Sequence, residues 1–194
     1  MYDVTVVFRK FKVGVAVHDG VVTQLKYLPL SAPSISPESE LAKRAERQLE
    51  GYKRDPNSAF DLPVVIEGSD LQKAVWKAMC AIPRGKTRTY GDLARELGAD
   101  PRDIGQCCGD NRLPLVIPCH RIVAADGIGG FAHATSGYLL EAKRWLLMHE
   151  AAATAFDSGR GKTVIFGGYS AFTNYDDTWE WDGTANKWTN RTTA

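Results

Sequence analysis

The stretch GDLARELGADPRDIGQCCGDN, residues 91–111, contains the pattern on which the fold assignment rests. A short amphipathic segment ends at Gly98, and a second begins with Asp100 as its cap and Pro101 at the first helical position. Two short helices joined by a tight, glycine-containing turn are typical of a helix-turn-helix, with residues 101–109 as the recognition element. The same pattern also occurs in purely structural helical domains.

Basic side chains are concentrated around this pattern. Residues 71–121 hold nine Lys and Arg against five Asp and Glu, whereas the whole chain has a formal net charge of only +1. A basic block in a nearly neutral chain favours a local contact with a polyanion. An ordinary solvated surface is the alternative.

A cysteine and a histidine stand side by side just beyond the pattern, in PLVIPCHRIVAADG, residues 114–127. A thiolate is an effective nucleophile, and a nearby base or positive charge generates it at neutral pH. Cys119 has His120 and Arg121 as neighbours, but adjacent side chains in a regular strand face opposite ways. His120 can therefore serve Cys119 only if the chain turns after Pro118. The alternative is a buried, inert thiol.

The four cysteines are not arranged as a disulfide framework or a zinc site. All lie in one block in the middle of the chain, with no converging pairs: Cys80, Cys107, Cys108 and Cys119. We expect no metal and no cofactor.

Length and composition narrow the class further. The 194 residues suit one ordinary domain or two small ones. No run approaches the roughly 18 apolar residues of a membrane span. The first residues, MYDVTVVFRKFKVG, carry charges where a signal peptide has its apolar region. We therefore expect a cytoplasmic protein that does not bind a membrane.

Antiparallel strands are predicted at the start of the chain. Residues 2–8 and 13–29 alternate and are rich in β-branched side chains, and Asp19-Gly20 interrupts the second run as a hairpin turn. Together with the helix that follows, they form an N-terminal α/β domain over residues 1–65.

An amphipathic helix follows over residues 36–54, with Ser36 as its N-cap and Pro37 at its first position. Residues 60–67 are predicted as a further strand or an extended connector. From Ser69 the apolar spacing becomes helical.

A second domain is predicted over residues 66–153. It begins with a helix over residues 69–82, contains the helix pair, and continues through the apolar run 113–117 and a glycine-rich loop. It ends in a helix over residues 139–150.

The tail, residues 160–194, differs in its residue pattern from the preceding helical segment, and it resembles a single kelch repeat. One such repeat cannot bury both of its faces, because kelch blades pack against neighbours. We expect a short, loosely attached β-meander without a role in the chemistry. The resemblance rests on Gly167, Gly168, Tyr175, Trp181 and Trp188.

Four ordered blocks resemble the O6-alkylguanine-DNA alkyltransferase family, the methylated-DNA–protein-cysteine methyltransferases. The most specific block is IPCHRI, residues 117–122, which matches the family's PCHR active-site motif. The others are GKTRTYGDLA (85–94), NRLP (111–114) and KRWLLMHE (143–150). The resemblance extends over residues 2–151.

By this resemblance, Cys119 accepts an alkyl group from guanine O6 and retains it as a thioether. His120 acts as the base through a water molecule, and Glu150 orients the histidine, in the manner of a nucleophile–base–orienter triad. Asn111 is the hinge that holds the turn between the recognition helix and an active-site strand. Tyr90 presses on the phosphate and donates a hydrogen bond to the extruded base.

The resemblance also implies duplex DNA as the partner, bound through the minor groove without sequence preference, with the alkylated base flipped out. Arg102 would fill the vacated place in the base stack. The other expected DNA-binding residues are Gly105, Gln106, Cys107, Gly109 and Arg121. The expected pocket residues are Ile122, Phe131 and Ala132.

The implied fold is a ribonuclease H-like N-terminal domain followed by a mostly helical domain with the helix-turn-helix. The implied activity is a single-turnover repair of O6-alkylguanine and O4-alkylthymine by a monomer. The alternatives are a non-catalytic alkyl-lesion binder, which would replace the cysteine, a cysteine hydrolase, which would turn over, and a plain helix-turn-helix regulator.

The chain departs from the family pattern around the pocket. Many members have Tyr-Ser-Gly-Gly where this chain has the longer FAHATSG, residues 131–137, without the tyrosine hydroxyl. Asp103 and Asp110 place negative charge near the expected DNA face. We expect the pocket size, and with it the preference for bulky alkyl groups, to differ.

Overall fold

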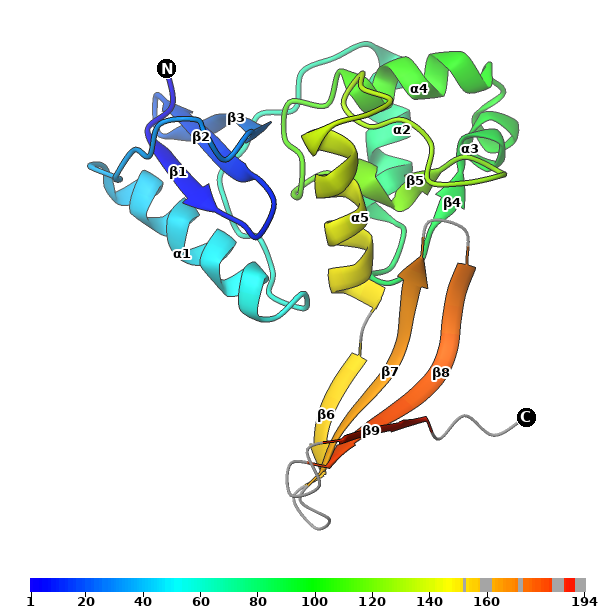
Figure 1. Cartoon of the computed structure of the whole chain (residues 1–194). Coiled ribbons are helices and arrows are strands. Elements are labelled where there is room, and N and C mark those ends of the chain that lie inside the picture. Colours follow the sequence, from blue (N-terminus) through cyan, green and yellow to red (C-terminus); the bar gives the residue numbers. More distant parts are fainter. Residues whose placement is uncertain (152, 158–161, 171–172, 183–186, 191–194) are drawn as a thin grey trace.

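The computed structural model describes residues 1–151, 153–157, 162–170, 173–182 and 187–190. It opens with an antiparallel sheet of three strands in the order β1 (Val4–Val7), β2 (Lys12–His18) and β3 (Val21–Leu28) (Figure 1). Asp19 and Gly20 both have positive φ, 48° and 76°, as a two-residue hairpin loop requires. The predicted hairpin is confirmed.

Helix α1 (Glu40–Arg54) packs across β1 and β2. It begins later than predicted, because Ser39 rather than Ser36 is its N-cap. The segment before it is held along β1 instead: Thr5 N–H donates to Ile35 O at 3.0 Å, and Ile35 N–H donates to Thr5 Oγ1 at 2.8 Å. These two bonds keep the chain extended before the helix starts.

An extended connector leads to the helical part of the molecule. Residues 60–67 contain one isolated bridge, Val64 to Val22, and no regular strand. Helix α2 (Asp70–Cys80) then begins with a capping box, in which Ser69 and Gln72 satisfy each other's backbone N–H groups.

The two short helices expected from the opening pattern are present as α3 (Tyr90–Leu97) and α4 (Pro101–Gly109). Gly98 ends α3 in the left-handed conformation, with φ 63°, and Asp100 caps α4. The two helices pack against each other and against α2.

A short parallel pair links α3 to the cysteine motif. Strand β4 (Arg88–Thr89) pairs with β5 (Ile122–Val123), which follows a 3₁₀ turn over Cys119–Arg121. Because α3 begins directly after β4, this pairing brings the start of α3 next to the cysteine motif. Helix α5 (Tyr138–Ala151) closes this part.

One hydrophobic core runs through the N-terminal sheet and the helices. Its aromatic centre joins the two: Phe8 stacks on Phe11 with centroids 4.8 Å apart, and Trp145 of α5 meets Phe8 edge-on at 5.5 Å. The sheet therefore supports α5, and α5 carries part of the site described below.

After α5 comes a four-stranded antiparallel meander: β6 (Ala153–Asp157), β7 (Lys162–Ser170), β8 (Thr173–Asp182) and β9 (Lys187–Asn190). A β-meander was expected here, and its first strand precedes residue 160. The kelch resemblance of this segment stays a prediction. Among the helices of the described residues, none has the length and apolar character needed to cross a membrane.

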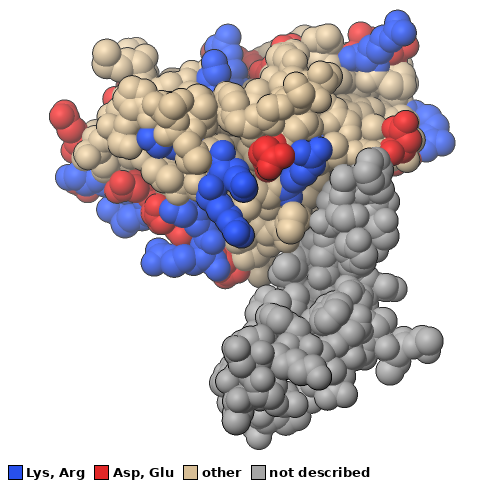
Figure 2. Space-filling model, in the orientation of Figure 1, with Lys and Arg blue, Asp and Glu red and all other residues tan. Residues whose placement is uncertain are grey.

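Acidic and basic side chains are interspersed over the face drawn in Figure 2, most densely over α1. The local basic excess of residues 71–121 therefore does not appear as a continuous basic surface on this face.

Candidate active site

Cys119 begins the 3₁₀ turn, so the chain bends where the sequence required a bend. Arg121 N–H donates to Pro118 O at 3.0 Å, and Cys119 N–H donates to Ile117 O at 2.9 Å. The cysteine is only 5% exposed. The turn removes the objection that adjacent side chains must face opposite ways.

Asn111 holds the loop that leads into this turn. Its Nδ2 donates to Ile117 O at 2.8 Å, and its Oδ1 accepts from Leu113 N–H at 2.9 Å. The strand expected between α4 and the cysteine is not formed: Leu115 has a φ of 76°, which a strand cannot include. A side-chain amide therefore fixes the backbone that a sheet would otherwise fix.

His120 and Glu150 form a close pair in the interior. His120 Nε2 lies 3.0 Å from Glu150 Oε1, and both side chains are almost wholly buried. The ring is not aligned for a good hydrogen bond, and neither of its nitrogens has a well-formed partner among the described residues. Burial lowers the pKa of His120, although Glu150 opposes this, so the ring is neutral at pH 7.

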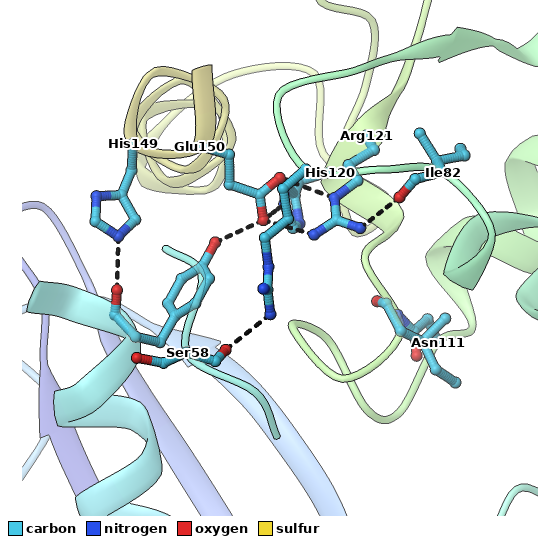
Figure 3. Close-up of polar contacts among 10 residues, drawn as sticks. Ser58, Ile82, Asn111, His120, Arg121, His149 and Glu150 are labelled. Atoms are coloured by element: carbon cyan, nitrogen blue, oxygen red, sulfur yellow. Dashed lines mark hydrogen bonds and ion pairs between the residues drawn. The ribbon is translucent and has the colours of Figure 1, made fainter. Parts of the chain in front are cut away.

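Glu150 accepts three hydrogen bonds from other side chains. Arg121 donates from Nε to Oε2 and from Nη2 to Oε1, both at 2.8 Å, and Tyr52 donates its hydroxyl to Oε1 at 2.9 Å (Figure 3). Burial by itself would raise the pKa of Glu150, but the hydrogen bonds from Arg121 and the nearby His120 ring hold that pKa well below its usual range. The carboxylate is therefore charged and fixed in place.

The position of Arg121 contradicts the predicted DNA contact. The side chain is buried, its guanidinium donates two hydrogen bonds to Glu150, and its Nη1 donates to Ile82 O at 2.6 Å. All of these hydrogen bonds are made to groups inside the protein, so the guanidinium does not face DNA. Arg121 is a structural partner of the carboxylate.

Two residues of the site were missed by sequence reasoning. Tyr52 lies on α1, and nothing near it in the sequence indicates a partner 98 positions away. Lys143 is fully buried, and its Nζ donates to Ile128 O at 2.6 Å and to Gly130 O at 2.9 Å. Lys143 lies four residues from both Leu139 and Leu147, so the three share one helix face. This spacing could have indicated that Lys143 is buried.

Lys143 and Asn111 set the electrostatics of the thiol. Burial raises the pKa of Cys119, while Asn111 and the Lys143 cation lower it in part. Burial also lowers the pKa of Lys143 to about 8. The resting cysteine is therefore a thiol, and it needs a base to become a nucleophile.

A cavity of about 480 Å³, here called the α4 cavity, opens between α4 and the glycine-rich loop, with Cys119 in its wall. Tyr90 enters the wall from the start of α3 and donates its hydroxyl to Gly130 O at 3.0 Å. Of the residues predicted for DNA or the pocket, Ile122 and Cys107 are buried outside this wall. The cavity does gather Tyr90, Arg102, Gly105, Gln106, Gly109, Cys119, Phe131 and Ala132.

The loop over the cavity is a tight turn. Phe131 and Ala134 exchange two backbone hydrogen bonds of 2.9 Å, and Ala132 and His133 between them have positive φ. His133 packs against the end of α4, with its Nε2 3.2 Å from Asp110 Oδ1. The described residues contain no group of three or more His, Cys, Asp or Glu placed to hold a metal ion.

Comparisons with known proteins identify the family of the chain. Residues 70–152 match the family described as "6-O-methylguanine DNA methyltransferase, DNA binding domain". The methylated-DNA–protein-cysteine methyltransferase of Methanosarcina barkeri is 42% identical over 56% of this chain and 67% of its own length. The protein of that name from Methanopyrus kandleri is 40% identical over 58% and 79%.

Solved structures of methyltransferases are also similar to this chain. The Mycobacterium tuberculosis protein described as OGT in complex with DNA superposes with a TM-score of 0.60 at 32% identity, covering 76% of this chain and 91% of that one. An O6-methylguanine DNA methyltransferase from Methanococcus jannaschii gives 0.55 at 26%, covering 79% and 97%. With relatives of this identity and coverage, the chain belongs to the methylated-DNA–protein-cysteine methyltransferase family of DNA repair proteins.

Proposed function

We propose that Cys119 takes the alkyl group from O6-alkylguanine in duplex DNA and keeps it, so that each molecule acts once. The observation that carries the proposal is the placement of Cys119 in the wall of the α4 cavity, next to the neutral, buried His120. The same chemistry would apply to O4-alkylthymine.

The first step is removal of the thiol proton. His120 is neutral and Glu150 is a fixed anion, so the ring can accept a proton and the carboxylate can stabilise the imidazolium that forms. Nδ1 of His120 is buried without a partner among the described residues, which leaves it free to hold a bridging water. The proton passes from Cys119 through that water to His120.

The second step is an in-line displacement. The Cys119 sulfur forms a bond to the alkyl carbon, the bond from that carbon to O6 breaks, and its electron pair stays with the base, which takes up a proton and becomes guanine. Burial raises the pKa of Tyr90, so its hydroxyl keeps its proton, and it would donate that proton to the extruded base after exchanging its bond to Gly130 O for one to the base. The thioether has no simple route back to a thiol.

DNA would approach along α4. Arg102 is exposed at the start of this helix and lines the cavity, where it could fill the gap left by a flipped base. Gly105 has open space where a side chain would stand, so the helix is narrow enough for a minor groove. Gln106 and Gly109 remain predicted contacts on α4, whereas Cys107 is buried and is no longer proposed as one.

The test is the intact mass of the protein after incubation with a duplex that carries one O6-methylguanine. We expect a gain of one methyl group that maps to Cys119 and is absent from Cys119→Ala. If the lesion is bound tightly and no mass is gained, the chain is a non-catalytic lesion binder and the proposal is wrong.

A further inference from the structure

One oxygen of Glu150 has three donors around it. Oε1 lies 2.9 Å from Tyr52 Oη and 2.8 Å from Arg121 Nη2. His120 Nε2 is 3.0 Å from the same oxygen. A carboxylate oxygen offers about two lone-pair sites. The three donors therefore compete for Oε1, whereas Oε2 accepts from Arg121 Nε at 2.8 Å.

His120 is the donor that lacks a well-aligned bond. Tyr52 and Arg121 both form hydrogen bonds to Oε1 (Figure 3). Both ring nitrogens of His120 are buried without a hydrogen-bond partner among the described residues. A buried N–H group without a partner is costly. The ring thus lies beside an acceptor that it cannot use while the other two donors occupy it.

Of the two donors bound to Oε1, Tyr52 is the one that can give way. Arg121 donates to both oxygens of the carboxylate and to Ile82 O, so its guanidinium is held at three points. The Tyr52 hydroxyl makes one bond, and it can rotate about its C–O axis. Burial raises the pKa of Tyr52, so it stays a neutral donor. An imidazolium is a stronger donor to a carboxylate than a neutral hydroxyl is.

We propose that Tyr52 is a positioning residue that sets the basicity of His120 by occupying Glu150 Oε1. While the hydroxyl occupies this oxygen, the His120 ring gains little from accepting a proton. When the ring takes the proton of Cys119, its Nε2–H group bonds to Oε1 and the hydroxyl turns away. The inference rests on the proposed proton transfer to His120. It gives helix α1, which lies outside the matched segment, a part in the chemistry.

The other charged groups near the ring act in the opposite direction to Glu150. Burial lowers the pKa of His120 most, and Arg121 from the 3₁₀ turn and Lys143 from α5 lower it further. Glu150 raises it. Arg84, from the loop after α2, lowers the pKa of Tyr52 and so opposes the effect of burial there. A change at Tyr52 therefore reaches His120 through Glu150.

The experiment measures how the single-turnover rate of transfer from free O6-benzylguanine to Cys119 depends on pH. Tyr52→Phe removes only the hydroxyl, and site-specific replacement of Tyr52 by 3-fluorotyrosine makes the hydroxyl a stronger donor. Tyr138→Phe is the matched control. Its hydroxyl also joins α5 to the N-terminal sheet, through Tyr27 O at 3.4 Å, but it makes no bond to His120 or Glu150. The ¹⁵N chemical shifts of the His120 ring report its protonation without any transfer.

We expect opposite shifts from the two changes at Tyr52. The rate falls at low pH because a protonated ring cannot act as a base. In Tyr52→Phe the ring gains Oε1, so its pKa rises and the low-pH limb should move up by about one pH unit, as for one hydrogen bond to a charged group. The Nε2 proton should also move downfield. In the 3-fluorotyrosine protein the limb should move to lower pH, and Tyr138→Phe should leave it in place.

Two results would overturn the proposal. A lower rate in Tyr52→Phe at every pH, with the limb unmoved, would show that the hydroxyl only supports packing. Shifts in the same direction in both modified proteins would rule out competition for Oε1. A wild type that transfers no alkyl group to Cys119 would instead contradict the proposed function, and the ¹⁵N titration of His120 would still decide whether Tyr52 sets its basicity.

Discussion

The buried contacts of Glu150 matter both for the stability of the fold and for the proposed role of this carboxylate beside His120. It faces Arg121, Tyr52 and His120 at distances of 2.8–3.0 Å in a site with almost no solvent. Removing one member of a buried charge pair leaves the other uncompensated, which costs more than the pair contributes.

The first prediction follows from this arrangement. Glu150→Gln should lower the free energy of unfolding by about 3–5 kcal/mol, because it leaves Arg121 buried without its anion. Tyr52→Phe is the milder companion and should cost about 1.5–3 kcal/mol, as for a hydrogen bond to a charged group. Urea denaturation at pH 7 measures both. Equal losses in the two variants would contradict the ion-pair account.

The same carboxylate predicts a pH dependence. The folded pKa of Glu150 is depressed, so its contribution to stability is present above the unfolded value of about 4.3 and is lost as the pH falls toward the folded pKa. Urea midpoints measured from pH 6 downward should therefore fall below about pH 4.3 more steeply in the wild type than in Glu150→Gln. Parallel curves would show that other carboxyl groups dominate.

Lys143 gives a prediction about the thiol. Its buried cation lowers the pKa of Cys119, so Lys143→Met should raise that pKa and slow alkylation of Cys119 by iodoacetamide at neutral pH, by about tenfold for each pKa unit. Arg144→Met, on the exposed face of the same helix, should leave the rate unchanged. Peptide mass spectrometry separates Cys119 from the exposed Cys80. Identical rates in the two variants would argue against the lysine.

At this scale, the sequence indicates candidates for the reacting side chains but not the contacts that hold them in place. The motif around Cys119 indicates the cysteine and its histidine. Arg121 was misassigned because a basic side chain next to a nucleophile can face DNA or a buried carboxylate, and only the path of the chain decides which. Tyr52 could not be found, because its contact depends on how α1 packs.

At the scale of elements, the two glycines of α4 differ in their surroundings. A Cβ on Gly105 would meet nothing within 4 Å, whereas a Cβ on Gly109 would lie 2.2 Å from Cε1 of His133. The absence of a side chain at Gly109 therefore lets the turn over residues 131–134 rest against the helix.

This contrast predicts opposite effects of the same substitution. Gly105→Ala should raise the free energy of unfolding by about 0.5–1 kcal/mol, the usual gain for a helix interior. Gly109→Ala should give no such gain, because His133 must move, and hydrogen exchange in the turn over residues 131–134 should become faster. Thermal unfolding and exchange measurements check the pair. A gain in stability at both positions would mean that the His133 contact is dispensable.

Local signals predicted most of the elements because their start and stop residues agree with their periodicity. The Asp19-Gly20 turn, the Gly98 stop and the Asp100 cap all appear as expected. The start of α1 was wrong because Ser36 and Ser39 are both adequate caps. The choice between them is made by Thr5 on a distant strand, which no local pattern contains.

At the scale of the whole molecule, the N-terminal sheet and the helices share one core, and this sharing supports the site. Tyr52 reaches Glu150 from α1. Helix α1 lies outside the matched segment, residues 70–152. The N-terminal part thus contributes a hydroxyl that helps to hold Glu150 in place, which spacing along the chain could not indicate.

The proposed role of Arg102 can be tested only in the complex of the protein with DNA. If the exposed guanidinium fills the gap left by a flipped base, its removal matters only when the base must first leave a duplex. Arg102→Ala should therefore slow repair of O6-methylguanine in duplex DNA far more than reaction with free O6-benzylguanine, because the free base has no stacking to lose. Arg144→Ala, an exposed arginine on α5, should slow neither. Single-turnover rates on both substrates decide the matter, and an equal loss on both would show that Arg102 supports the cavity instead of the flipped state.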